Sequence, residues 1–391
     1  MTRRDLLPAR AAVGAAFFGN GFGIGIWAAQ LPRFKAALGL SDGQLSLGLL
    51  AFSIGAVALM PVVGWAITVV GSRLATITAA FAFTATLLLV GLAPSLPLFV
   101  AASLLAGASN GTMDISMNTN ATVVEKAWGT AIMSSFHAFF SLGGLAGAAL
   151  SGLLIALEFS IFQTLLAACL GMGLLFVAAA FGMMSETKRA RDGEGHGFAL
   201  PRGPVVVVAV LAMFCFVVEG AMVDWTAIYL QTVAGADLQA AVTGFAAFSL
   251  AMTICRFLGD AVVRALGRAR TVQVGGLLAA SGLSLAILLP QPIPATLGFA
   301  LVGFGLANVV PVLFSAAAQM EGIAPSVGVA MVATLGYGGY LMGPPLIGFG
   351  GDLVGLRVML GVLILFAIII VILSRHALHL PTVQFSAMRP K

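Results

Sequence analysis

The chain has 391 residues, of which 60% are hydrophobic and 8% are charged, whereas roughly 25% of residues are charged in soluble domains. A water-soluble fold cannot bury that much apolar surface, and the apolar segments are too long for barrel strands, so the composition predicts an all-α polytopic membrane protein. The formal charge of +5 comes from basic residues scattered over short loops, which gives no indication of nucleic-acid binding.

Twelve apolar segments are long enough to be transmembrane helices. In chain order they cover residues 11–30, 44–69, 74–93, 97–121, 130–156, 160–183, 204–230, 241–263, 271–289, 293–318, 326–350 and 357–374. A polar stretch separates two sets of six. We therefore expect an N-terminal six-helix bundle in residues 1–184, a cytoplasmic linker in 185–203 and a C-terminal six-helix bundle in 204–391.

The distribution of basic residues predicts the orientation in the membrane. With the N-terminus inside, the outer loops hold only Arg33, Lys35 and Arg357, and nearly all of the other Lys and Arg residues fall in inner segments. Cytoplasmic loops carry this excess of positive charge. Both termini are therefore expected in the cytoplasm, and the protein in a bacterial inner membrane.

The second half of the chain repeats glycines of the first half at a constant offset. The matched pairs are Gly48 and Gly244, Gly71 and Gly267, Gly107 and Gly303, Gly143 and Gly339, Gly147 and Gly343, and Gly152 and Gly348. A parallel repeat of two six-helix halves is one of the architectures on which alternating access is built. The repeat therefore predicts two pseudo-symmetric bundles.

Two loops carry related patterns, G-W-A-I-T-V-V-G-S-R at 64–73 and G-D-A-V-V-R-A-L-G-R at 259–268. With the six-plus-six layout, they resemble the G-x-x-x-D-R-x-G-R-R signature of the major facilitator superfamily. Thr68 stands where the signature has its acid, and Asp260 is displaced, so the first copy departs from the inner-gate motif. The resemblance implies a gating role for Arg73 and Asp260 and transport by rocking of two bundles.

Three further segments, at 113–126, 134–147 and 219–230, are similar to a little-characterised bacterial inner-membrane branch near the fucose permeases. That likeness implies solute transport without naming a solute. The G-x-x-x-G-P-x-x-G-G signature of drug/proton antiporters has no counterpart in the fifth segment, which lacks proline there. This absence weighs against drug efflux.

An ionisable side chain inside a span costs at least about 2.5 kcal/mol, so each one needs a partner, a wet cavity or a function. Asp114 and His137 lie on the fourth and fifth segments, which a short loop joins, so we expect these helices to run side by side and the pair to share a depth. The pair either takes up and releases protons or forms a fixed hydrogen bond. Asn118, one turn from Asp114, either lines an inner vestibule or bonds another helix.

The seventh and eighth segments carry four more ionisable groups. Glu219 lies near the midplane with no basic residue on its own helix, so we expect it to be protonated at rest and to carry coupled protons; the alternative is a buried structural carboxyl. Asp224 is predicted to form an outer gate with Arg33. Arg256 and Asp260 are spaced for a local ion pair, and an Arg256 that faced the cavity would favour an anionic solute.

Several uncharged side chains are candidates for solute contact, although polar residues also bond between helices. They are Asn20, Trp27, Gln30, Trp225, Asn308, Tyr337 and Tyr340. Trp225 is alternatively an interfacial anchor. Pro344 and Pro345 predict a kink in the eleventh helix.

These features favour a monomeric, proton-coupled secondary transporter of a small polar organic solute, with sugar-like compounds among the candidates. A drug or metabolite exporter of the same fold is the alternative, and a transport-inactive receptor or scaffold is an alternative of another class. Neither catalytic motifs nor clustered metal ligands occur, so no enzyme, metal or cofactor is expected. The three cysteines lie in apolar segments without paired spacing.

Overall fold

The computed structural model describes the chain except residues 1–2, 131, 186–199, 321–322, 324 and 379–391. The described residues form helices joined by short connections, and they form no sheet. The helices are α1 (Arg3–Leu38), α2 (Asp42–Ala58), α3 (Met60–Val70), α4 (Ser72–Gly91), α5 (Leu96–Trp128), α6 (Met133–Ala156), α7 (Ile161–Gly182), α8 (Val205–Thr232), α9 (Leu238–Ala241), α10 (Thr243–Phe257), α11 (Gly259–Leu266), α12 (Arg268–Leu288), α13 (Pro292–Leu306), α14 (Val309–Ala318), α15 (Pro325–Val354) and α16 (Leu356–Leu378).

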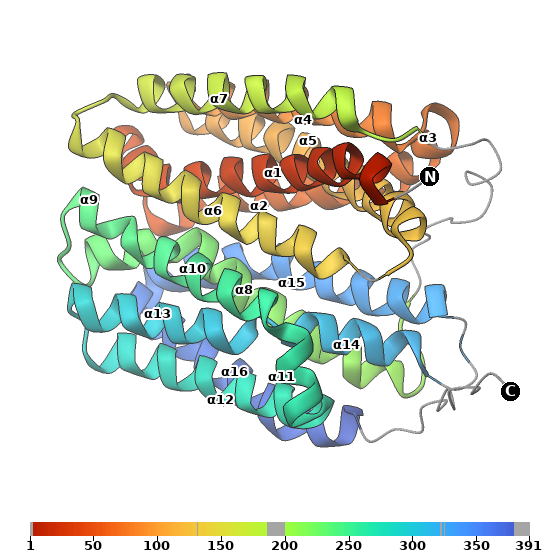
Figure 1. Cartoon of the computed structure of the whole chain (residues 1–391). Coiled ribbons are helices and arrows are strands. Elements are labelled where there is room, and N and C mark those ends of the chain that lie inside the picture. Colours follow the sequence, from red (N-terminus) through yellow and green to blue (C-terminus); the bar gives the residue numbers. More distant parts are fainter. Residues whose placement is uncertain (1–2, 131, 186–199, 321–322, 324, 379–391) are drawn as a thin grey trace, which may run out of the picture.

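The helices form two bundles, an N-terminal one of α1–α7 and a C-terminal one of α8–α16 (Figure 1). Ten described helices are long and apolar enough to cross a membrane, or eleven if α2 and α3 are one bent span. Helix α1 begins and helix α16 ends at one end of the molecule, which we name the terminal end; the opposite end, where α2 begins, is named the far end. Most of the predicted linker lies outside the described residues.

The predicted repeat is present in the packing. Within the N-terminal bundle α1 packs along α6 and α7, and α5 packs along α2 and α4; α8 packs along α15 and α16, and α13 along α10 and α12, in the same way. Gly107 of α5 lies against the backbone of Phe52, and Gly303 of α13 lies against that of Phe248. Small residues at these positions let the helices approach closely. The glycine repeat is therefore explained by equivalent helix contacts in the two bundles.

The repeated pair Gly71 and Gly267 is explained by backbone conformation and not by close helix packing. Gly71 ends α3 with φ 85° and Gly267 ends α11 with φ 77°, a region that residues with a side chain rarely adopt. The next helix begins one residue later in each case, at Ser72 and at Arg268. These glycines let one helix end and the next begin with a single residue between them.

Three of the predicted spans are broken helices. The segment 44–69 divides at Leu59 into α2 and α3, which are bent by 42°; Pro61, at the start of α3, cannot donate a backbone hydrogen bond to α2. Breaks also occur between α10 and α11 and between α13 and α14, the latter ahead of Pro311. By contrast, Pro344 and Pro345 lie inside α15, which continues through them as one helix.

A polar contact ties three helices of the N-terminal bundle at the terminal end. Buried Asn120 of α5 donates to the Ser72 hydroxyl of α4 at 2.8 Å and to the Met184 carbonyl after α7 at 2.9 Å. Interhelical hydrogen bonds in membrane proteins average well under 2 kcal/mol each. The contact therefore contributes to the stability of this bundle without dominating it.

Asn120→Ala is accordingly expected to destabilise the protein by about 1 kcal/mol, since both of these bonds are lost. The measurement is the thermal unfolding midpoint of the detergent-purified protein. Thr78→Ala is the matched control, because Thr78 lies on α4 and, among the described residues, its hydroxyl bonds to carbonyls of its own helix. An equal midpoint shift in the two variants would contradict the assignment.

The bundles meet mainly along two helix pairs, α2 with α15 and α6 with α10, and α1 also contacts α8. At the far end Gly348 of α15 lies against Ser46 of α2. Further from that end, Gly144 of α6 lies against Phe245 and Ser249 of α10. The structure therefore holds the bundles together through the far half of these helices.

Candidate functional site

An arginine in the last turn of α10 joins the two bundles beside the middle of α8. Arg256 of α10 contacts the Glu219 carboxylate of α8 at 3.1 Å and donates to the Ser141 hydroxyl of α6 at 2.6 Å. The side chains of Arg256 and Glu219 are only 15% and 13% exposed. A charge pair so shielded from water attracts more strongly than one on the surface, and it also costs more to bury.

This arrangement corrects one prediction. Glu219 is not without a basic partner, because α10 packs against α8 and brings Arg256 to it. Arg256 binds Glu219 and Ser141. The Asp260 side chain lies outside the described residues, so the predicted local pair of Arg256 with Asp260 stays a prediction. The predicted gating role of Asp260 stays a prediction.

An aromatic cluster lies beside the ion pair. It consists of Phe216 on α8 and of Tyr337 and Tyr340 on α15, with ring centroids 5.9 Å apart for Phe216 and Tyr337 and 4.8 Å for Phe216 and Tyr340. Tyr340 is close enough to Glu219 and Arg256 to interact with both electrostatically. Aromatic faces with hydroxyl groups suit the apolar and polar faces of a ring-shaped solute.

Asp114 and His137 are not a hydrogen-bonded pair. Asp114 accepts from Asn118 Nδ2 at 3.2 Å and interacts electrostatically with Tyr337 across the bundles. His137 packs edge-on against Phe17, with ring centroids 5.3 Å apart. It also lies close enough to Arg256 for an electrostatic interaction. The prediction of side-by-side helices was wrong, because α6 packs along α1, and α5 along α2 and α4.

Asn118 bonds within its own helix. Its amide donates to the Asp114 backbone carbonyl at 2.8 Å as well as to the carboxylate. The side chain is half-buried. The amide therefore holds the Asp114 carboxylate against α5 and makes none of the predicted bonds to another helix among the described contacts.

Three candidates on α1 lie in the packed interior of the N-terminal bundle. Asn20 donates to Asn110 Oδ1 of α5 at 3.3 Å, and Gln30 donates to Ser151 Oγ of α6 at 2.5 Å. Trp27 is 2% exposed and stacks on Phe52 and Phe99. These contacts tie α1 to α2, α5 and α6, and the predicted solute contact of the three residues stays a prediction.

The predicted gate between Arg33 and Asp224 is not formed. Arg33 donates to Gln30 Oε1 at 3.2 Å and to the Phe159 carbonyl at 2.8 Å, both within its own bundle. Trp225 is fully buried, so it is not an interfacial anchor, and its indole N–H has no hydrogen-bond partner among the described residues. An unpaired buried donor of this kind is costly.

The remaining two candidates contact backbone carbonyls. Asn308, at the break before α14, donates to the Cys255 carbonyl at 3.3 Å. Arg73 donates to the Ala180 carbonyl at 3.1 Å and to Ser185 Oγ at 3.3 Å, which ties α4 to the end of α7. Within the described part of the chain no group of three His, Cys, Asp or Glu side chains is placed to hold a metal.

Comparison with known proteins identifies the family. The family model of the Major Facilitator Superfamily matches residues 13–323. The chain belongs to the major facilitator superfamily. It is a multi-pass membrane transporter, with a predominantly apolar helical chain that fits this assignment.

Three relatives match most of the chain. An uncharacterised MFS-type transporter of Yersinia pestis is 38% identical over 88% of this chain and 90% of its own length. Membrane protein MosC of Rhizobium meliloti is 33% identical over 88% of this chain and 84% of its own length. The uncharacterised transporter y4wD of Sinorhizobium fredii is 31% identical over 95% of this chain and 98% of its own length. The predicted likeness to the fucose permeases stays a prediction.

Solved structures confirm the major facilitator fold. A point mutant of the nucleoside transporter NupG superposes with a TM-score of 0.74 at 10% identity, covering 94% of this chain and 98% of NupG. A bacterial homolog of the human lysosomal transporter Spinster superposes with a TM-score of 0.73 at 14% identity, covering 95% of this chain and 97% of the homolog. At these identities the likeness concerns the fold alone.

For a major facilitator chain, the contacts that sequence reasoning missed are those made between helices. Ser141, the partner of Arg256 in the other bundle, looks like any serine in an apolar helix. Asn110, which bonds Asn20, likewise has no distinguishing neighbour. A local signal does exist at the start of α2, where the letters S-D-G-Q at 41–44 form a capping-box pattern. That pattern predicts where the helix begins but not which residues of other helices it contacts.

Proposed function

We propose that the protein is a proton-coupled secondary active transporter of a small polar organic solute, with sugar-like compounds among the candidates. It works by alternating access as a monomer in a bacterial inner membrane, with both termini in the cytoplasm. The observation that carries the proposal is the link from Glu219 through Arg256 to Ser141, which joins the two bundles beside the middle of α8.

The chemistry of that link suits proton coupling. A carboxylate paired with an arginine loses the attraction when it takes up a proton, so a proton and Arg256 compete for Glu219. Arg256 also contacts Ser141 of the opposite bundle, so a change at Glu219 alters a contact between the bundles. Membrane-embedded ionisable groups commonly serve as such proton relays.

The solute is proposed to bind between Arg256 and the aromatic cluster. Tyr337 and Tyr340 provide ring faces and hydroxyl groups on the C-terminal side, and Asp114 with Asn118 lies on the N-terminal side. These groups lie on α5, α8, α10 and α15, so they belong to both bundles. Transporter sites lie at such interfaces between repeats.

The test begins with a thermal-shift screen of the purified protein against sugars, sugar acids, amino acids and cationic drugs. The compound with the largest shift is then radiolabelled, and its uptake is measured in proteoliposomes with and without an imposed pH gradient. We expect uptake driven by the pH gradient. Uptake that follows only a sodium gradient would contradict the proposal.

Glu219→Gln is expected to lose gradient-driven uptake, down to the level of empty liposomes, because the glutamine cannot take up the coupled proton. Exchange of labelled for unlabelled solute should persist, since exchange needs no net proton movement. Glu158→Gln is the matched control, because Glu158 is exposed in a far-end loop. Gradient-driven uptake that survives in Glu219→Gln would remove this residue from the coupling step.

A further inference from the structure

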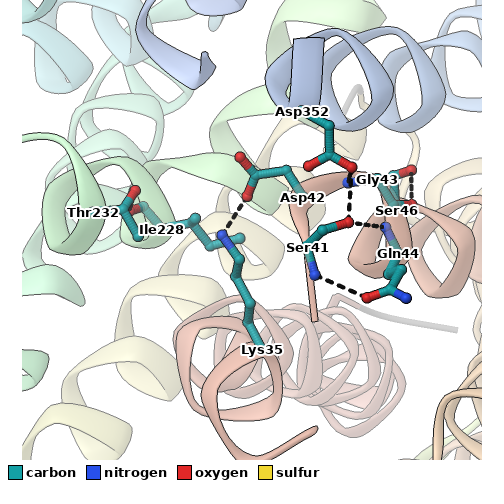
Figure 2. Close-up of polar contacts among 9 residues, drawn as sticks. All are labelled: Lys35, Ser41, Asp42, Gly43, Gln44, Ser46, Ile228, Thr232 and Asp352. Atoms are coloured by element: carbon teal, nitrogen blue, oxygen red, sulfur yellow. Dashed lines mark hydrogen bonds and ion pairs between the residues drawn. The ribbon is translucent and has the colours of Figure 1, made fainter. Parts of the chain in front are cut away.

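A carboxylate of one bundle binds the N-terminus of a helix in the other bundle at the far end (Figure 2). Asp352 of α15 accepts a hydrogen bond from the Ser41 hydroxyl at 2.7 Å and one from the Gly43 backbone N–H at 3.0 Å. Ser41 and Gly43 lie at the start of α2. One side chain therefore makes two of the polar contacts between the bundles.

The start of α2 offers hydrogen-bond donors to this carboxylate. Ser41 is its N-cap, and it exchanges hydrogen bonds with Gln44 in a capping box, at 3.1 Å and 3.0 Å. That box leaves the Gly43 N–H without a partner inside the helix, and Asp352 supplies one. A negative group is also favoured there by the helix dipole.

Two further features favour the packing of the end of α15 against the start of α2. Gly348 has no side chain where a Cβ would lie 2.7 Å from the Asp42 carbonyl oxygen, and Gly351 lies beside the Asp42 carboxylate. Lys35 at the end of α1 forms an ion pair with Asp42. The ammonium group offsets the negative charge of Asp42 and so weakens its repulsion of Asp352.

We propose that Asp352 is a gating residue, whose contact with Ser41 and Gly43 closes the far end of the passage and breaks whenever the bundles open on that face. The inference rests on alternating access as proposed above, but neither the solute nor the coupling ion enters it. Lys35 acts as a positioning residue, because it keeps Asp42 neutralised beside the contact.

The test measures the opening of the far end without any solute. Spin labels are placed at Ala37→Cys and Gln239→Cys, which are exposed at the far end in the N- and C-terminal bundles, after Cys169, Cys215 and Cys255 are replaced by alanine. Electron paramagnetic resonance gives the distribution of label distances in nanodiscs. Asp352→Asn is expected to increase the long-distance population relative to the parent protein.

The matched control is Asp237→Asn. Asp237 is also a far-end aspartate that caps a helix, since its Oδ1 accepts from Ala240 N at 2.7 Å, but this contact stays within the C-terminal bundle. Its label distances should equal those of the parent. An equal increase in Asp237→Asn and Asp352→Asn would overturn the proposal, because the effect would then be a general one of lost caps.

A second variant tests the same contact without changing a charge. Gly348→Ala places a methyl group against Asp42 and Ser46 and should also lengthen the distances. Gly338→Ala on the same helix has open space around its added methyl group and should not. Unchanged distances in both Asp352→Asn and Gly348→Ala, in protein that elutes and melts like the parent, would show that the contact does not hold the far end closed.

Discussion

Replacement of Gly143 by valine is expected to prevent accumulation of folded protein. Gly143 of α6 lies against α1, where a Cβ would be 2.8 Å from the Phe22 nitrogen and closer still to the Phe18 carbonyl. Both obstacles are backbone atoms, so no side-chain rotation relieves the overlap. Overpacking of a core typically costs about 1–3 kcal/mol, and more where the neighbours cannot move.

The measurement is the monodisperse peak of a fluorescent fusion in size-exclusion chromatography, followed by thermal unfolding of any protein that elutes there. Gly171→Val is the matched control, since Gly171 on α7 has no atom within 4 Å of an added Cβ. We expect Gly171→Val to behave as the parent protein. If Gly143→Val did so too, the close contact between α1 and α6 would not be as described.

Arg256→Gln should give the second large effect, because it leaves the Glu219 carboxylate buried without its cation. Removing one partner of a buried ion pair typically costs about 3–5 kcal/mol. Glu219→Gln combined with Arg256→Gln leaves no unpaired charge, so the double variant should be more stable than Arg256→Gln alone. Gradient-driven uptake should be lost in both variants, since Glu219 or its partner is missing.

The comparison is made on thermal unfolding midpoints in detergent. Arg264→Gln serves as the control, because Arg264 is exposed on α11, and it should leave the midpoint unchanged. A double variant no more stable than Arg256→Gln would mean that the two side chains are not coupled. The proposed proton step at Glu219 would then lose its structural basis.

The fold was largely predictable because its signals are local or periodic. Apolar segments gave the spans, and the glycine repeat anticipated equivalent contacts such as Gly107 with Phe52 and Gly303 with Phe248. The breaks at Leu59 and Leu258 were missed, since a hydropathy window averages over a break. The adjacency of α5 and α6 was predicted wrongly, because a short loop fixes where two helices connect but not which neighbours they pack along.

The site was less predictable, because its partners come from different helices. Glu219 and Arg256 were both recognised as costly residues in spans, but sequence spacing reveals only partners on the same helix and so favoured Asp260 for Arg256. Ser141 gave no signal at all. Asp352 was overlooked because an acid at a helix end is ordinarily solvated, and only the packing of α15 on α2 brings it to Ser41.

Alternating access between the two bundles requires that the polar residues between them border a water-accessible passage. It is tested by reacting Asn118→Cys, in protein without its native cysteines, with a membrane-impermeant maleimide in right-side-out and inside-out vesicles. Thiols react as thiolates, which require water, so we expect Asn118→Cys to be labelled, whereas Leu174→Cys, 74% exposed on the outer surface of α7, stays unlabelled in the lipid. Folded Asn118→Cys as unreactive as Leu174→Cys in both preparations would contradict the account.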